Sequence, residues 1–309
     1  MYKILSISFL LCLFFTHAIS QKPKILLSPE FHMPKTKLLE GHLHSNSSGH
    51  YIYFKKLGGL TGNKVSYILE KYDNNFKNIF SKEYKANKRN IYGKEIKYFK
   101  NKFAWLLYER NSKSNYLEYF IRPIDMIGKS LSNKPIAKLK YKNVWNLPTT
   151  KWKVSKDTSS ILFIAENDND RKNENYEVYL SVIDGDFDKI WSKKIKLPFS
   201  QKRVDVISWE LTNDGKVFFV AKIYGDDWNI ESKKSRDKKQ KIPAYDIALY
   251  SMNAEMSKPT KYKLKLNDAF AKEVKLHANN DNDLTCVGFF GDSSSGPIHG
   301  VFYMKLSRE

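Results

Sequence analysis

The stretch GDSSSGPIHGV, Gly291–Val301, is where this sequence looks most like a catalytic centre. It places three consecutive serines, Ser293 to Ser295, close to His299, and a serine nucleophile needs a general base within hydrogen-bond reach. A nucleophile loop of the GDSGGP kind has glycine directly after its serine, whereas Ser293 is followed by two more serines. No other base motif precedes it. We therefore predict a hairpin turn here and no catalytic residue.

Two histidines, His42 and His44, have the spacing of a metal-binding pair, and His32 and His50 lie nearby. Residues at i and i+2 on a strand face the same side, as a two-histidine site requires. The surrounding Ser45–Gly49 is loop-like, and neither a second spaced pair nor an acidic third ligand is evident. The pattern favours exposed polar histidines, and no metal site is predicted.

Acidic clusters at Glu166–Asp170 and Asp184–Asp188 suggest calcium ligands. An EF-hand loop needs glycine at its sixth position and glutamate at its twelfth. Counted from Asp184, those positions hold Lys189 and Ile195, so the template fails. Both clusters are better explained as turns and loops.

A basic run interrupts the chain between two apolar segments. Its six cations are Lys233, Lys234, Arg236, Lys238, Lys239 and Lys241. Cations on a loop attract phosphate or sulfate groups in a strongly salt-dependent way, so the run predicts an anion-binding loop. A solvated loop without a partner is the alternative.

The whole chain is basic: 53 Lys and Arg against 33 Asp and Glu give a net charge of +20. This excess favours an anionic partner such as an acidic glycan or a lipid head group. A solvated lysine-rich surface is the competing explanation. The sequence has no glycine-rich phosphate loop, dinucleotide fingerprint or CxxC motif, so no cofactor is predicted.

The first twenty residues predict a signal peptide. A short positive start precedes the apolar run Ile4–Phe15, and Ala18–Ser20 forms a small-x-small cleavage site before Gln21. The apolar run is shorter than the ~20 residues that a membrane-spanning helix needs. We expect an exported protein, periplasmic, outer-surface or secreted, with no transmembrane segment. Export argues against nucleic acid as the physiological partner.

Cleavage at that site would leave Cys286 as the one cysteine of the mature chain. It lies in the apolar run LTCVGFF and has no partner for an intramolecular disulfide bond. We expect a buried thiol that behaves as a small hydrophobic side chain.

An internal repeat positions these features. Tyr72–Lys82 and Ile183–Lys193 share Asp, Phe, Ile, an aromatic residue, Ser and Lys in register, and Ile124–Ser130 occupies the equivalent place between them. Leu249–Asn253 is a weaker fourth copy, and Phe302–Ser307 is a fifth that stops where its turn is due. Each copy follows another apolar strand: Tyr51–Phe54, Phe103–Tyr108, Ile161–Ala165, Val217–Tyr224 and Leu284–Phe290.

Units of about 50 to 70 residues with three or four strands each indicate an all-β fold of β-propeller-like repeats. About five units are visible, and the last is incomplete. Tandem β-sandwich domains are the alternative. We divide the chain into the signal peptide (1–20), an N-terminal strand and loop segment (21–48) and a propeller-like domain (49–309). That domain is expected to be truncated, or closed by an early strand at Lys24–Leu27.

Several of these motifs resemble an exported propeller-like repeat family of Gram-negative bacteria. They are Leu69–Asp73, Phe76, Phe80–Glu83, Tyr224–Gly225 before the basic run, and the hairpin Gly288–Phe290 with Gly300–Tyr303. The resemblance spans roughly Gly49 to Leu306. It implies propeller-like repeats and transfers no catalytic residue to this chain.

From these observations we predict a non-enzymatic binding or scaffold protein of the cell envelope. Its partner would be a protein or an anionic glycan or lipid head group. The alternative is a propeller-type hydrolase or lyase that acts on glycans at the mouth of the channel. An enzyme of that kind would bring two or more carboxylates, or histidine with tyrosine or arginine, together near the axis.

Overall fold

A computed structural model describes residues 37–39, 44–58, 64–86, 90–141, 147–166, 174–225, 243–264, 266, 269–293 and 296–306. These residues form twenty β-strands and one 3₁₀ turn, Gln201–Arg203. Within this part of the chain no helix is long and apolar enough to cross a membrane.

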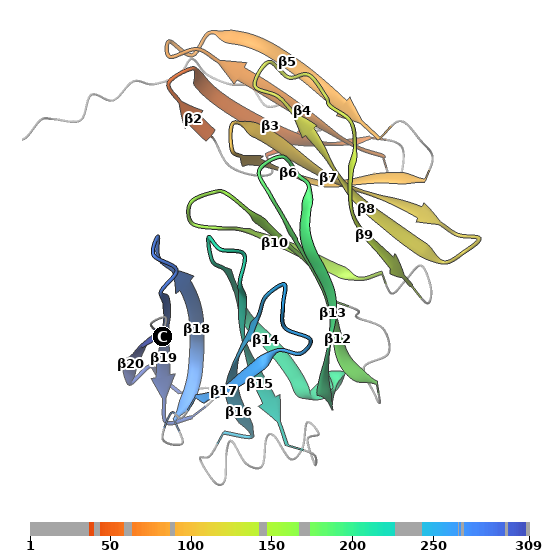
Figure 1. Ribbon diagram of the computed structural model, residues 1–309. Coiled ribbons are helices and arrows are strands. Elements are labelled where there is room, and N and C mark those ends of the chain that lie inside the picture. Colours follow the sequence, from red (N-terminus) through yellow and green to blue (C-terminus); the bar gives the residue numbers. More distant parts are fainter. Residues whose placement is uncertain are drawn as a thin grey trace, which may run out of the picture.

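The strands form five antiparallel sheets (Figure 1). The first contains β1 (Lys37–Leu39), β2 (His44–Asn46), β3 (Gly49–Gly58), β4 (Lys64–Tyr72) and β5 (Asn78–Lys85). The second contains β6 (Ile91–Phe99), β7 (Lys102–Asn111), β8 (Tyr116–Ile124) and β9 (Lys134–Lys140). The third contains β10 (Thr149–Val154), β11 (Ile161–Glu166), β12 (Asn175–Ile183) and β13 (Lys189–Ser200). The fourth contains β14 (Val204–Leu211), β15 (Val217–Tyr224), β16 (Tyr245–Met252) and β17 (Thr260–Leu264), and the fifth contains β18 (Phe270–Ala278), β19 (Leu284–Gly291) and β20 (Gly300–Leu306).

Strands pair in chain order within the second to fifth sheets. In the first sheet β3, β4 and β5 do so, and β1 and β2 both pair with β3. Each sheet is thus a meander of neighbouring strands, which is the topology of a propeller blade. Figure 1 shows the sheets following one another along an arc, with the first and fifth sheets at its two ends.

The second and third strands of the second, third and fourth sheets are largely apolar on both faces because each of these sheets packs between two others. All of Phe103–Leu107 in β7 and all of Ile161–Ala165 in β11 are buried. A strand with one face in water would instead alternate apolar and polar residues. The continuous apolar runs in the sequence therefore predict stacked sheets.

Four apolar clusters lie between consecutive sheets, one for each pair of neighbours. Large aromatic side chains fill them. Tyr67 of the first sheet meets Trp105 of the second edge-on, with ring centroids 5.9 Å apart. Tyr119 and Phe163 connect the second sheet to the third at 5.2 Å. None of the four clusters combines described residues of the first and fifth sheets.

The repeated turn has the same hydrogen bonds in each copy. Asp73, Asp125 and Asp184 each accept two backbone N–H groups on Oδ1, from the residues two and four positions later. The fourth residue of each turn has positive φ: 60° at Phe76, 73° at Gly128 and 64° at Phe187 in the three copies. The sequence repeat is therefore a repeated side-chain-stabilised turn between the third and fourth strands.

The predicted fold class is confirmed. The five sheets are the five predicted units, the described part of the last one has three strands, and the topology is not that of tandem sandwiches. One boundary differs, because β1 and β2 join the first sheet ahead of the predicted start at Gly49. The predicted signal peptide and the strand Lys24–Leu27 lie outside the described residues.

Candidate anion-binding surface

The six cations of the predicted anion-binding loop lie outside the described residues. Their place in the fold is given by the residues on either side, Gly225 after β15 and Ala244 before β16. The Gly225 N–H donates to the Ala244 carbonyl at 3.4 Å. The basic run therefore connects the two central strands of the fourth sheet, at the end of the sheet where β15 stops and β16 begins.

Arg203, beside this end of the sheet, and Lys261 of β17 approach one aromatic ring. The guanidinium carbon of Arg203 lies 5.5 Å from the ring centroid of Phe199, and Lys261 Nζ lies 5.3 Å from it. Phe199 is half-buried at the end of β13, and Lys261 is exposed on β17. We call these three residues the Phe199 surface. A cation near an aromatic face is attracted electrostatically by the ring, so Phe199 draws both cations toward one place.

The Phe199 surface is linked to the ends of the basic run. Arg203 donates from Nε to the carbonyl of Tyr224, the last residue of β15, at 2.8 Å. Tyr224 packs edge-on against Tyr245, the first residue of β16. Arg203 therefore lies beside the strand from which the basic run leaves the sheet.

Further lysines extend this basic region along the outer strands of the third and fourth sheets. Lys194 and Lys196 of β13 share one carboxylate, Glu177, and Lys263 of β17 pairs with Asp246 at 3.3 Å. Two cations on one carboxylate leave a local positive excess. The outer strands of these two sheets therefore carry several exposed lysines.

The first strands of the second to fifth sheets carry a row of charged side chains, which we call the inner-strand row: Glu95, Lys97, Lys153, Glu210 and His277. Lys97 pairs with Glu95 at 3.6 Å, and Lys153 of β10 pairs with Glu210 of β14 at 3.7 Å. In a propeller the first strand of each blade lies nearest the axis. Each of the two carboxylates in this row thus has a lysine partner.

Burial shifts two pKa values within the inner-strand row. It lowers the pKa of Lys97, while Glu95 opposes the shift. It raises the pKa of Glu210, and the neighbouring Lys153 and His277 act on that pKa in the opposite direction. A carboxyl group with a raised pKa is a candidate proton donor. Glu210 is therefore the residue in this row that is best suited to donate a proton.

The GDSSSGPIHGV stretch joins β19 to β20, as predicted from its composition. His299 Nδ1 lies 2.7 Å from Asp292 Oδ2, and both side chains are exposed. Ser293 Oγ accepts the Gly296 N–H at 2.9 Å. The described serine is therefore used in the turn, and the histidine is paired with an aspartate instead.

The described histidines of the N-terminal group make aromatic contacts. His44 stacks on Tyr98 with centroids 3.3 Å apart, and burial lowers its pKa. His50 stacks on Phe76 at 4.8 Å and bonds Ser45 through Nδ1. His32 and His42 lie outside the described residues. Among those described, no group of three or more His, Cys, Asp or Glu side chains is placed to hold a metal ion.

The second acidic cluster forms one of the repeated turns and contacts the neighbouring sheet. Asp186 pairs with Lys102 at 3.0 Å and Asp188 with Lys134 at 2.7 Å. Asp184 binds backbone N–H groups of its own turn. These carboxylates therefore join the third sheet to the second. In the first cluster Glu166 pairs with Lys151 at 3.2 Å, and its other residues lie outside the described part.

Sequence reasoning identified neither the Phe199 surface nor the inner-strand row. Phe199 and Lys261 are far apart in the chain and come together only because the third sheet packs on the fourth. The row takes its residues from four different sheets, where each occupies an ordinary strand position. No local pattern marks either group.

No family model and no curated protein matches the chain. Among solved structures it is similar to an acylaminoacyl peptidase of Pyrococcus horikoshii, at 12% identity and a TM-score of 0.41 over 84% of this chain and 39% of that one. It is also similar to the β-propeller domain of the Trilobed protease from Pyrococcus furiosus, at 12% identity and a TM-score of 0.44 over 89% of this chain and 80% of that one. A third similar structure is an α-L-arabinanase of Penicillium chrysogenum, at 8% identity and a TM-score of 0.39 over 88% of this chain and 82% of that one.

The chain spans about two fifths of the length of the peptidase structures it resembles. At these identities and TM-scores no activity passes from any of them to this protein. The propeller-like assignment rests on the strand topology described above.

Proposed function

We propose that this protein is an exported binding or scaffold module of the cell envelope that contacts an anionic component. The Phe199 surface is the observation that carries the proposal, because it holds two cations on one aromatic ring, and one of them, Arg203, lies at the strand end from which the basic run leaves. Arg203, Lys261 and the six cations of that run would together contact several phosphate or sulfate groups. The net charge of +20 favours approach of such a partner from a distance.

The test is titration of the protein with heparin, a sulfated glycan, and separately with vesicles that contain an anionic lipid. Lys261→Ala removes one cation and is expected to weaken binding roughly threefold to tenfold at low salt, since charge-assisted contacts to anions are each of this size. Neutralising the six cations of the basic run should weaken it further. Raising the salt concentration should weaken binding in every case.

Lys156→Ala is the matched control, because Lys156 is also exposed but lies in the turn between β10 and β11. That turn is at the opposite end of the third sheet from Phe199. If Lys156→Ala weakened binding as much as Lys261→Ala, only the overall charge would matter and the assigned surface would be wrong.

The alternative function, a hydrolase or lyase that acts on glycans, is favoured by Glu210 alone. Its raised pKa and its position beside His277 suit a proton donor. Each described carboxylate of the inner-strand row faces a lysine, whereas glycoside hydrolysis uses two carboxyl groups on either side of the scissile bond. Release of reducing ends from an acidic glycan, abolished by Glu210→Gln, would replace the binding proposal with this one.

A further inference from the structure

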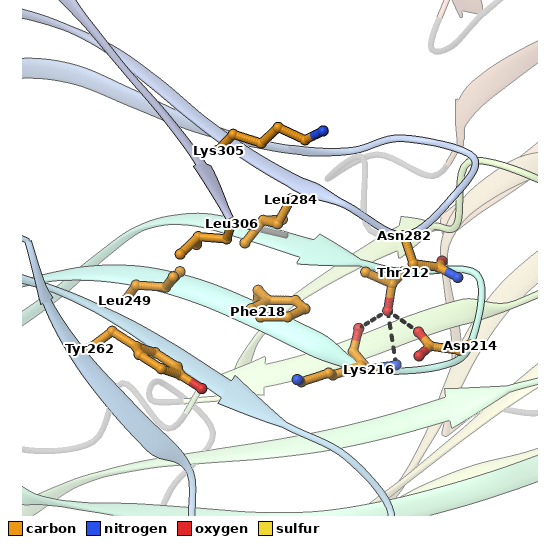
Figure 2. A pocket seen from close by; sticks show the side chains of 10 residues that line it. All are labelled: Thr212, Asp214, Lys216, Phe218, Leu249, Tyr262, Asn282, Leu284, Lys305 and Leu306. Carbon is orange, nitrogen blue, oxygen red and sulfur yellow. Dashed lines mark hydrogen bonds between the residues drawn. The ribbon is translucent and has the colours of Figure 1, made fainter. Parts of the chain in front are cut away.

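A cavity of about 630 Å³ lies between the fourth and fifth sheets. One wall comes from β15, β16 and β17, and the other from β19 and β20 (Figure 2). The size falls within the range of about 300 to 1,000 Å³ that is typical of small-molecule sites. It is separate from both the Phe199 surface and the inner-strand row.

The walls of this cavity combine apolar and polar side chains. Phe218 and Leu249 line it from the fourth sheet, and Leu284 and Leu306 from the fifth, where they are direct cross-strand partners. Leu249 and Leu284 are fully buried, while Phe218 and Leu306 are half-buried and so accessible from the cavity. Phe218 and Leu306 therefore offer the apolar surface that a hydrocarbon chain could contact.

Polar groups gather at one end of the cavity, where the turn between β14 and β15 lies. Figure 2 shows Thr212, Asp214 and Asn282 at that end, with the Lys216 side chain running from it toward Phe218 and Tyr262. The backbone N–H of Lys216 donates to Thr212 Oγ1 at 3.1 Å, so the hydroxyl fixes the start of β15. The position of Lys216 is therefore set by the turn.

Lys216 is the cation of the cavity that is available to a ligand. The second lysine in the lining, Lys305, is held by Asp283 at 2.8 Å. Lys216 Nζ instead lies 5.0 Å from the ring centroid of Phe218, and no ion pair joins it to a carboxylate in the described part of the chain. An acidic group bound by Lys216 would leave the rest of the ligand beside Phe218.

We propose that this cavity binds an amphipathic carboxylate, with an aliphatic chain against Phe218 and Leu306 and its acid group on Lys216. This would be a small-molecule site in addition to the anionic surface partner. Because a buried methylene contributes about a fourfold gain in affinity, binding should tighten from octanoate to dodecanoate by up to that factor per carbon.

The experiment is calorimetric titration of the protein with dodecanoate and with dodecan-1-ol, both below their micelle-forming concentrations. Lys216→Met keeps the length of the side chain and removes its charge. This substitution should lower the affinity for dodecanoate about tenfold, because one charge-assisted contact is lost. The affinity for dodecan-1-ol should stay unchanged. Lys156→Met is the matched control and should change neither.

Leu306→Trp places a larger side chain in the cavity and should block both ligands. A ligand that still binds this variant would lie elsewhere, and the proposal would fail. It would also fail if neither ligand bound, or if Lys216→Met weakened the acid and the alcohol equally. Should Leu306→Trp not fold, methyl NMR shifts of Leu249 and Leu284 in the unmodified protein report occupancy, and unchanged shifts at saturation would overturn the proposal.

Discussion

At the scale of single residues, Asp184 shows how one side chain specifies a turn. It accepts the N–H groups of Asp186 and Asp188, both at 2.9 Å. Asp184→Ala leaves both donors without that acceptor and should lower the free energy of unfolding by about 1–2 kcal/mol. Asp184→Asn keeps an oxygen in place and should cost clearly less. Urea denaturation measures both, and equal losses would show that the hydrogen bonds are not the cause.

Cys286 provides a second prediction at this scale. It is fully buried in the apolar cluster between the fourth and fifth sheets, and burial raises the pKa of its thiol to about 11. Because the thiolate is the reactive form, a thiol reagent at pH 8 should modify the native protein at least about a hundredfold more slowly than the denatured protein. Mass spectrometry over time measures the two rates. Similar rates would mean that the fifth sheet opens readily.

At the scale of elements, β14 places Glu210 where its ionisation opposes folding. The folded-state pKa of this carboxyl is raised above its ordinary value of 4.5. Its contribution to stability is therefore fully present below that value and is lost as pH rises through the folded-state pKa. Glu210→Gln stays neutral, so the stability of the variant relative to the unmodified protein should increase between pH 4 and pH 7. Denaturation at several pH values tests this, and a constant difference would contradict it.

The elements were predictable to very different degrees. The strands around Phe103 and Ile161 follow from short β-branched and aromatic runs, and the turn at Asp184 follows from a repeated pattern that carries its own hydrogen bonds. The Phe199 surface and the Lys216 cavity depend on how one sheet packs against the next. Such packing is fixed by distant side chains, and a single sequence records no sign of which faces will meet.

At the scale of the whole molecule, the five sheets differ in how many neighbours they have. The third sheet packs against the second through one apolar cluster and against the fourth through another. The first and fifth sheets each contribute to one cluster among the described residues. In such a series local unfolding starts at the ends, because an end sheet loses one interface when it opens while a central sheet loses two.

Hydrogen exchange should therefore be graded along the chain. Backbone amides of β11 and β12 should exchange slowest, and those of β20, which pairs with β19 alone among the described strands, should exchange fastest of the strands. Peptide-resolved mass spectrometry measures this order directly. Equal protection of the first, third and fifth sheets would contradict an open series. It would instead support closure of the ring by a further strand, for which Lys24–Leu27 is the candidate in this sequence. Deleting that segment should then speed exchange in β20 alone, and exchange in β11 should stay unchanged.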